Sequence, residues 1–173
     1  GMTHSGQPKP DIFGQALADG RFAAFSDRII YAYVRELEGA NSWARERWHR
    51  EYIGKILHYN AAPEDWIVIG DADEIPNPDV LRGLPSAGFT GAALELDFYY
   101  YTFNRRVRQG WAIGAFQWGV ERNTHRIRTC EGHEVPHIDN AGWHFSYFMP
   151  PERVVDKLDA FMHHGDVAAQ VPR

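Results

Sequence analysis

The chain has 173 residues, of which 44% are hydrophobic and 24% are charged, the composition of an ordinary soluble domain with room for one core. Its formal net charge of -5 gives no electrostatic basis for nucleic-acid binding, its single Cys130 excludes an intrachain disulfide, and no apolar run approaches the length of a membrane span. We therefore expect one domain over residues 1–173 in a cytoplasmic setting, with Gly1 as a remnant of tag removal and Met2 as the natural start.

The first predicted elements are a helix and a strand. Residues 11–26 carry a weak helical pattern of apolar side chains. Residues 28–34, with the sequence Arg-Ile-Ile-Tyr-Ala-Tyr-Val, have the β-branched and aromatic composition of a strand. A loop at 37–42 then leads to a longer helix.

The longer helix is predicted at residues 43–59. Glu46, Arg50, Ile53 and Leu57 fall on one stripe of this helix, which begins charged and ends apolar. If Ile53 and Leu57 pack on a sheet, Glu46 and Arg50 point inward at the end of the helix where a ligand site would lie. The alternative is an ion pair at i,i+4 spacing on the surface.

A short apolar run at residues 65–76 ends in three carboxylates (Asp-Trp-Ile-Val-Ile-Gly-Asp-Ala-Asp-Glu-Ile-Pro). Its length and composition predict a buried strand of a parallel sheet, with Asp71, Asp73 and Glu74 at the edge where open α/β sheets bind ligands. In an extended chain, Asp71 and Asp73 point to the same side, and a hard cation such as magnesium or manganese would relieve their repulsion. The alternative is a solvated acidic turn in which an aspartate caps a helix.

Strands dominate the second half of the chain. In the strand predicted at 88–102, Glu95 and Asp97 share one face. In the strand predicted at 141–148, His144 faces away from its neighbour Trp143, as a structural histidine or as a ligand. The other predicted segments are a short helix at 78–84, a basic turn at 104–110, a strand at 111–120, a polar segment at 124–140 and a last helix at 150–162.

Several blocks of the sequence together resemble glycosyltransferase family 17. The two most specific blocks are Asp-Ala-Asp-Glu-Ile-Pro at 71–76 and Gly-Trp-His-Phe-Ser at 142–146. They occur in the family's order and, with the weaker blocks, span nearly the whole chain. The weaker blocks are Thr-His-Ser-Gly-Gln-Pro-Lys-Pro at 3–10, Asp-Arg-Ile-Ile at 27–30, Trp43 with Glu46 and Arg50, and Lys157-Leu158 with Phe161 and His163.

The resemblance implies an α/β chain with a GT-A-like fold, in which helices flank a mixed, mostly parallel central sheet, here without the first strand and helix of the family. It also implies Mn²⁺ or Mg²⁺ between an Asp-x-Asp motif and the diphosphate of a UDP-sugar. On this sequence the implied metal ligands are Asp71, Asp73 and His144, with Asp71 also a contact of the ribose. Arg50 is the implied contact of the diphosphate, and Glu46 beside it is a second predicted residue of the donor site.

The reaction that the resemblance implies is an inverting transfer of a sugar, N-acetylglucosamine in the family, to a carbohydrate acceptor. A carboxylate base takes the proton of the acceptor hydroxyl while the metal stabilises the departing diphosphate. We assign the base to Asp97 and predict Glu74 as a second catalytic carboxylate. The other candidate bases are Glu95, Glu134 and Asp139.

Two other functions compete with transfer. A non-catalytic remnant of this fold would bind carbohydrate or a protein partner through its tryptophan and tyrosine surface, without metal. A haloacid-dehalogenase-like phosphatase also uses an apolar strand followed by Asp-x-Asp, but that strand opens its domain, whereas a predicted strand and a long helix precede residues 65–76 here. Strand edges left exposed by the missing first unit would favour a homodimer.

Overall fold

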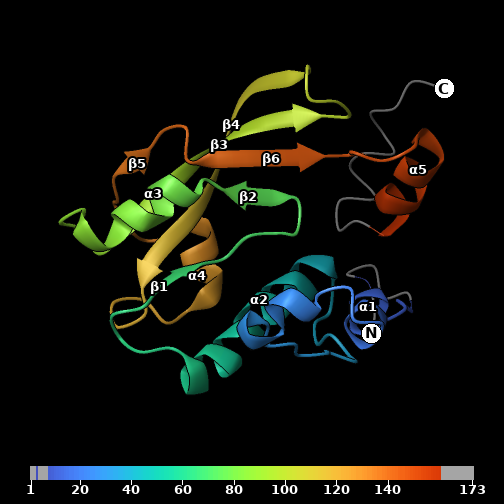
Figure 1. The fold of residues 1–173 in the computed structure, drawn as a ribbon, viewed down its shortest axis with the longest axis horizontal. Helices are drawn as coiled ribbons and strands as arrows, with labels where there is room; N and C mark the ends of the chain where they lie inside the picture. The colour runs from blue at the N-terminus through green and yellow to red at the C-terminus, as the bar shows by residue number, and fades with distance from the viewer. Residues whose placement is uncertain (1–2, 4–7, 161–173) are drawn as a thin grey trace. The chain divides into compact units, whose positions relative to one another are not determined.

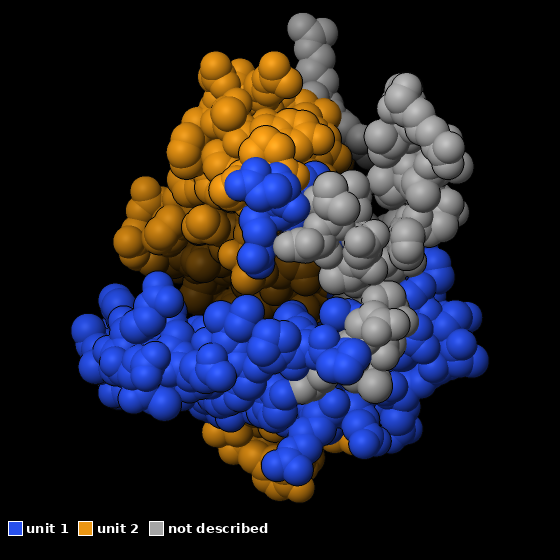
Figure 2. Space-filling view, turned by 90° about the vertical axis from the view of Figure 1, so that its right-hand side faces the viewer, with its two compact units in different colours: residues 1–52, 152–173 blue, residues 53–151 orange. Residues whose placement is uncertain are grey.

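The computed structural model describes residue 3 and residues 8–160. Contacts between Cα atoms divide the chain into two compact units, coloured separately in Figure 2. Residues 1–52 and 152–173 form unit 1, and residues 53–151 form unit 2. Among the described residues, no helix combines the length and the apolarity needed to cross a membrane.

Unit 1 consists mainly of helices. The side chain of Asp11 caps α1 (Ile12–Ala18) by accepting a hydrogen bond from the Gly14 amide at 2.8 Å. The other elements of the unit are η1 (Ala23–Arg28), the first part of α2 (Ser42–Asn60) and most of α5 (Pro151–Ala160). The helices predicted at 43–59 and 150–162 are therefore confirmed as α2 and α5, although the end of the second lies outside the described residues.

The strand predicted at 28–34 is wrong. The described backbone forms no strand there, and Ile30 is 63% exposed. Tyr31 instead packs edge-on against Phe13 of α1, with ring centroids 5.6 Å apart, and its hydroxyl donates a hydrogen bond to Asp11. The composition favoured a strand, but a strand is stabilised by its neighbours, and no described strand pairs with these residues.

Unit 2 is built on a six-stranded sheet with the order β1-β4-β3-β6-β2, in which β5 also pairs with β3 (Figure 1). The β1·β4, β3·β4 and β2·β6 pairs are antiparallel, and the β3·β6 and β3·β5 pairs are parallel. The strands are β1 (Trp66–Val68), β2 (Glu74–Pro76), β3 (Gly91–Tyr100), β4 (Arg106–Gln117), β5 (His137–Ile138) and β6 (Gly142–Ser146), and the helices within the unit are α3 (Pro78–Gly83), η2 (Leu84–Ser86) and α4 (Thr124–Thr129).

The predicted mostly parallel sheet is wrong, and the β3–β4 connection explains why. Only residues 101–105 separate the two strands, which is too short for the crossover helix that parallel neighbours need. The basic segment at 104–110, predicted as a turn, is largely the first part of β4. The chain is thus an α/β protein whose sheet is mixed and mainly antiparallel.

The sheet buries apolar side chains on both of its faces. Leu94 of β3 and Ile113 of β4 pack with Leu84 of η2, and we call this side the η2 face. Phe116 of β4 packs with Ile127 of α4 on the other side, which we call the α4 face. Because side chains alternate along a strand, Ile113 and Phe116, three residues apart, point in opposite directions.

Local signals located most elements but missed one helix. Asn77 caps α3 by accepting from the Asp79 amide at 3.0 Å, and β3 and β6 lie within the strands predicted at 88–102 and 141–148. The six-residue α4 lies in the segment at 124–140 that was predicted only as polar, because so short a helix carries no readable apolar period.

Candidate functional site

The acidic segment after β1 is a turn between the two edges of the sheet. β1 ends at Val68 and β2 begins at Glu74, and these strands are the two ends of the strand order. The Glu74 amide donates to the Asp71 carbonyl at 3.0 Å, which closes the turn over residues 71–74. The argument that Asp71 and Asp73 converge because the backbone is extended is therefore wrong. We call residues 71–74 the acidic turn.

Glu74 holds the acidic turn in place. Its side chain is 0% exposed, and one carboxylate oxygen accepts from the Trp111 indole at 2.6 Å and from the Arg128 guanidinium at 2.5 Å. The other oxygen accepts from the Asp71 amide at 2.7 Å. Burial raises the pKa of Glu74, and Arg128, the Asp71 amide and the Trp111 indole oppose that rise. With both oxygens bound to the protein, this carboxylate is placed to support the turn rather than to receive a proton from a substrate.

Arg128 is the residue at this site that sequence reasoning missed. It comes from α4, its side chain is 8% exposed, and its Nη1 donates to the Ala112 carbonyl at 3.1 Å. Its Nη2 bonds Glu74 and lies 4.0 Å from the Asp71 carboxylate, while the guanidinium carbon lies 5.8 Å from the centre of the Trp111 ring. Arg128 and Glu74 are 54 positions apart, so no local pattern could pair them.

Asp73 and His144 lie side by side. His144 is opposite Glu74 in the β2·β6 ladder, and its Nε2 is 3.7 Å from a carboxylate oxygen of Asp73. The imidazole is 6% exposed, stacks parallel on Phe98 at 4.3 Å between ring centroids, and lies 4.5 Å from the Trp111 ring. These contacts fix the ring on the η2 face, with one nitrogen directed at Asp73.

The Asp73–His144 pair has the spacing of two ligands of one cation. Ligand atoms about 2.1 Å from a shared ion are about 3.0 Å apart at right angles and about 4.2 Å apart when opposed, which brackets the 3.7 Å observed. Asp71 is 63% exposed and lies beside Arg128. Within the described part of the chain, no three side chains of the metal-binding types form one group. A cation here would complete its shell with water and substrate oxygens, as magnesium commonly does.

Asp97 points away from this pair. It is opposite Trp143 in the β3·β6 ladder, whereas the next residue, Phe98, is opposite His144 and stacks on it. Side-chain alternation therefore puts Asp97 on the α4 face and His144 on the η2 face. Asp97 forms an ion pair with Arg106. Asp97 is therefore separated from His144, because adjacent positions in a strand point to opposite faces.

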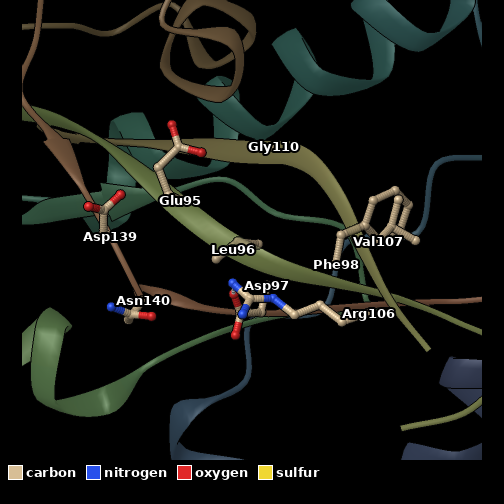
Figure 3. Close-up of a pocket in the computed structure, with 9 residues that line it drawn as sticks. All are labelled: Glu95, Leu96, Asp97, Phe98, Arg106, Val107, Gly110, Asp139 and Asn140. Atoms are coloured by element: carbon tan, nitrogen blue, oxygen red, sulfur yellow. Dashed lines mark ion pairs between the residues drawn. The ribbon is translucent and has the colours of Figure 1, made fainter. Parts of the chain in front are cut away.

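Asp97 lines a pocket of about 760 Å³ (Figure 3). Two more of the candidate bases, Glu95 and Asp139, line the same pocket, whereas Glu134 does not. Glu95 also lies 2.6 Å from the Nδ1 atom of His137. The described residues that line the pocket are Glu95, Leu96, Asp97, Phe98, Arg106, Val107, Gly110, Asp139 and Asn140.

Glu46 and Arg50 form the predicted pair on α2, within unit 1. Arg50 Nη2 lies 2.5 Å from a Glu46 carboxylate oxygen, and their side chains are 17% and 8% exposed. The alternative of a solvated surface pair is therefore wrong. Their role at a diphosphate stays a prediction.

Comparisons with known proteins agree on one family. The sequence model of glycosyltransferase family 17 matches residues 1–171. The chain is 23% identical over 191 residues to the β-1,4-mannosyl-glycoprotein 4-β-N-acetylglucosaminyltransferase of Rattus norvegicus, and 22% identical to that of Homo sapiens. Each alignment covers 91% of this chain and 36% of the relative. It thus spans about a third of the length of these relatives. No solved structure matches the chain.

Proposed function

The chain belongs to glycosyltransferase family 17, and on that premise we propose that it transfers a sugar from a nucleotide sugar to a carbohydrate acceptor. The donor we propose is a UDP-sugar and the transferred sugar N-acetylglucosamine, the sugar in the names of the relatives. A GT-A-like fold is part of the same proposal. The observation that carries it is the Asp73–His144 pair, since both residues come from the two family blocks and lie 3.7 Å apart.

In this proposal Asp73 and His144 hold Mn²⁺ or Mg²⁺ through a carboxylate oxygen and an imidazole nitrogen. Such an ion, when bound, would neutralise the charge that develops on the departing diphosphate. Asp71, exposed on the same turn, is the proposed contact of the donor. Phe98 and Trp111 keep the His144 ring in one orientation, so the ligand atoms need little reorganisation when a donor arrives.

Glu74 acts in this proposal as a positioning residue. Its carboxylate joins the Asp71 amide to Trp111 and Arg128, which fixes the acidic turn against the sheet. We propose an inverting transfer from the family alone. We do not assign its base to Glu95 or Asp97, because both side chains point to the other face of the sheet.

The test is an Asp73→Asn variant of the full chain. We expect this variant to bind UDP-N-acetylglucosamine at least about tenfold more weakly in the presence of Mn²⁺, as measured by calorimetry. The reason is that the change removes the carboxylate, one of the two proposed ligands of the cation. Asp79→Asn is the matched control, since the Asp79 side chain is 86% exposed on α3 and forms an ion pair with Arg82. Equal affinity in Asp73→Asn and the wild type, or binding that survives EDTA unchanged, refutes the proposal.

A further inference from the structure

The pocket around Asp97 forms where both neighbours of β3 leave the regular ladder. On one side, Leu96 pairs with Trp111 while Phe98 pairs with Val107, so three residues of β4 lie opposite the single residue Asp97. On the other side, β5 pairs with β3 as far as Leu94 and β6 resumes only opposite Asp97. Residues 139–141 lie between β5 and β6, and the first two of them line the pocket.

The lining of the pocket suits hydroxyl groups. Glu95, Asp97 and Asp139 supply carboxylate oxygens that accept hydrogen bonds, and Arg106 and Asn140 supply N–H donors (Figure 3). The volume of about 760 Å³ falls within the range of small-molecule sites, roughly 300–1,000 Å³. A monosaccharide or disaccharide is a ligand of this size and polarity.

The charge of the pocket excludes two other ligand classes. Among the described lining residues, three carboxylates face one guanidinium, a net negative charge that would repel a diphosphate or any other anion. A cation would need carboxylates available to it, but Asp97 is paired with Arg106 and Glu95 lies 2.6 Å from His137. Carboxylates that already have partners can still accept hydrogen bonds from neutral hydroxyl groups, because each carries several lone pairs.

An exposed tryptophan stands on the strand next to the pocket. Trp143 of β6 is opposite Asp97 in the ladder, shares the α4 face with it, and is 38% exposed. On β2, the residue opposite Trp143 is Ile75, which is 48% exposed. A flat apolar ring beside a group of hydrogen-bonding side chains is suited to stack on the C–H face of a sugar while its hydroxyls bond the polar groups.

We propose that this pocket, together with Trp143, is a second saccharide site that binds a neutral sugar without a cation. It goes beyond the proposed transferase function, because its carboxylates Glu95 and Asp97 point to the α4 face whereas Asp73 and His144 meet on the η2 face, and Phe98 is a lining residue that also contacts His144. A site of this kind would hold a glycan on the protein independently of the donor.

The experiment titrates the full chain with N,N′-diacetylchitobiose and mannobiose, followed by the NMR signals of the tryptophan indole groups. We expect at least one disaccharide to bind with millimolar or tighter affinity, equally with EDTA and in Asp73→Asn. Trp143→Ala and Arg106→Gln should each weaken this binding about fivefold to tenfold, through loss of stacking and of a hydrogen-bond donor. The matched controls are Trp43→Ala, at an exposed tryptophan of unit 1, and Arg105→Gln, next to Arg106; neither should change it.

Four results overturn the proposal. The first is no binding of either disaccharide at about 20 mM. The second is loss of disaccharide binding with EDTA or in Asp73→Asn, and the third is tighter binding of the cation glucosamine than of the neutral sugars. The fourth is an unchanged affinity for the disaccharide in Arg106→Gln. Arg106 is exposed, so its variant keeps the test decisive even if Trp143→Ala fails to fold. A loss of donor binding in Asp73→Asn bears only on the transferase proposal. A loss of disaccharide binding in Arg106→Gln bears only on the saccharide site.

Discussion

Replacing Arg128 by methionine should destabilise the protein much more than the same replacement at Arg126. The change keeps a long apolar side chain but leaves the Glu74 carboxylate, which is 0% exposed, without its cationic partner. Breaking a buried pair from one side typically costs about 3–5 kcal/mol. The Ala112 carbonyl also loses its donor, which adds about 1 kcal/mol. We therefore expect the free energy of unfolding to fall by about 4–6 kcal/mol, the sum of these two costs.

The assay is urea unfolding at pH 7 followed by tryptophan fluorescence. The matched control is Arg126→Met on the same helix, because the Arg126 side chain is 45% exposed and lies 3.6 Å from Glu121. Glu121 is 10% exposed, but it keeps the Arg122 and Asn123 amides and His133 as partners when Arg126 is lost, so the control should cost only about 1 kcal/mol. A double variant, Glu74→Met with Arg128→Met, should recover part of the loss, since two apolar side chains leave no buried charge.

The dependence of the Arg128→Met loss on pH gives a second check of the same reasoning. Burial raises the pKa of Glu74, and Arg128 is the largest opposing influence, so removing Arg128 raises that pKa further. A protonated Glu74 needs no cation, so the destabilisation should shrink as the pH falls toward 4.5. A loss of under about 1 kcal/mol at pH 7, or a double variant whose loss is the sum of the two single losses, would show that the pair does not hold the acidic turn.

Two further predictions concern buried carboxylates and a close backbone contact. Because the pKa of Glu74 is raised, the stabilisation that this group contributes is complete below pH 4.5 and is lost as the pH rises. Burial raises the pKa of Glu121, but the Asn123 amide, His133 and Arg126 lower it overall. The stabilisation from Glu121 is therefore present above pH 4.5 and is lost as the pH falls. Unfolding of Glu74→Gln and Glu121→Gln against the wild type at several pH values should therefore give opposite slopes, and slopes of the same sign would contradict these assignments. In Gly114→Ala the new Cβ would lie 1.7 Å from the Ile127 carbonyl oxygen, so thermal unfolding should report a loss of about 1–3 kcal/mol, whereas Gly83→Ala, with open space around it, should lose nothing.

The sequence blocks point to the correct family, but the geometry of their residues depends on partners far along the chain. The alternation argument placed His144 opposite to Trp143, and the structure agrees: His144 stacks on Phe98, and Trp143 pairs with Asp97. The same argument, applied to β3, separates Asp97 from His144, but only once the pairing of β3 with β6 is known. A single sequence predicts strands from local composition, while the neighbour and the register of a strand are set by the whole sheet.

The acidic turn shows the same division between local and distant information. Residues 65–76 read as one strand with its acids at the end, yet β1 and β2 sit at opposite edges of the sheet. The turn is held by Arg128, from a helix whose six residues carry no periodic signal, and by Trp111. Buried charge pairs between distant positions cannot be inferred from one sequence, because each partner alone looks like a solvated side chain.

Strand β6 connects both proposals, because its alternation sends consecutive residues of one family block to different sites. His144 reaches the η2 face beside Asp73, and Trp143 reaches the α4 face beside Asp97. The ladder on either side of β6 holds both side chains in register, so a change at one position need not disturb the other. If the two sites are separate, Trp143→Ala should keep the Mn²⁺-dependent binding of the donor while it loses the disaccharide. A parallel loss of both ligands in a variant that unfolds at the wild-type temperature would mean that one site, not two, is built on this strand.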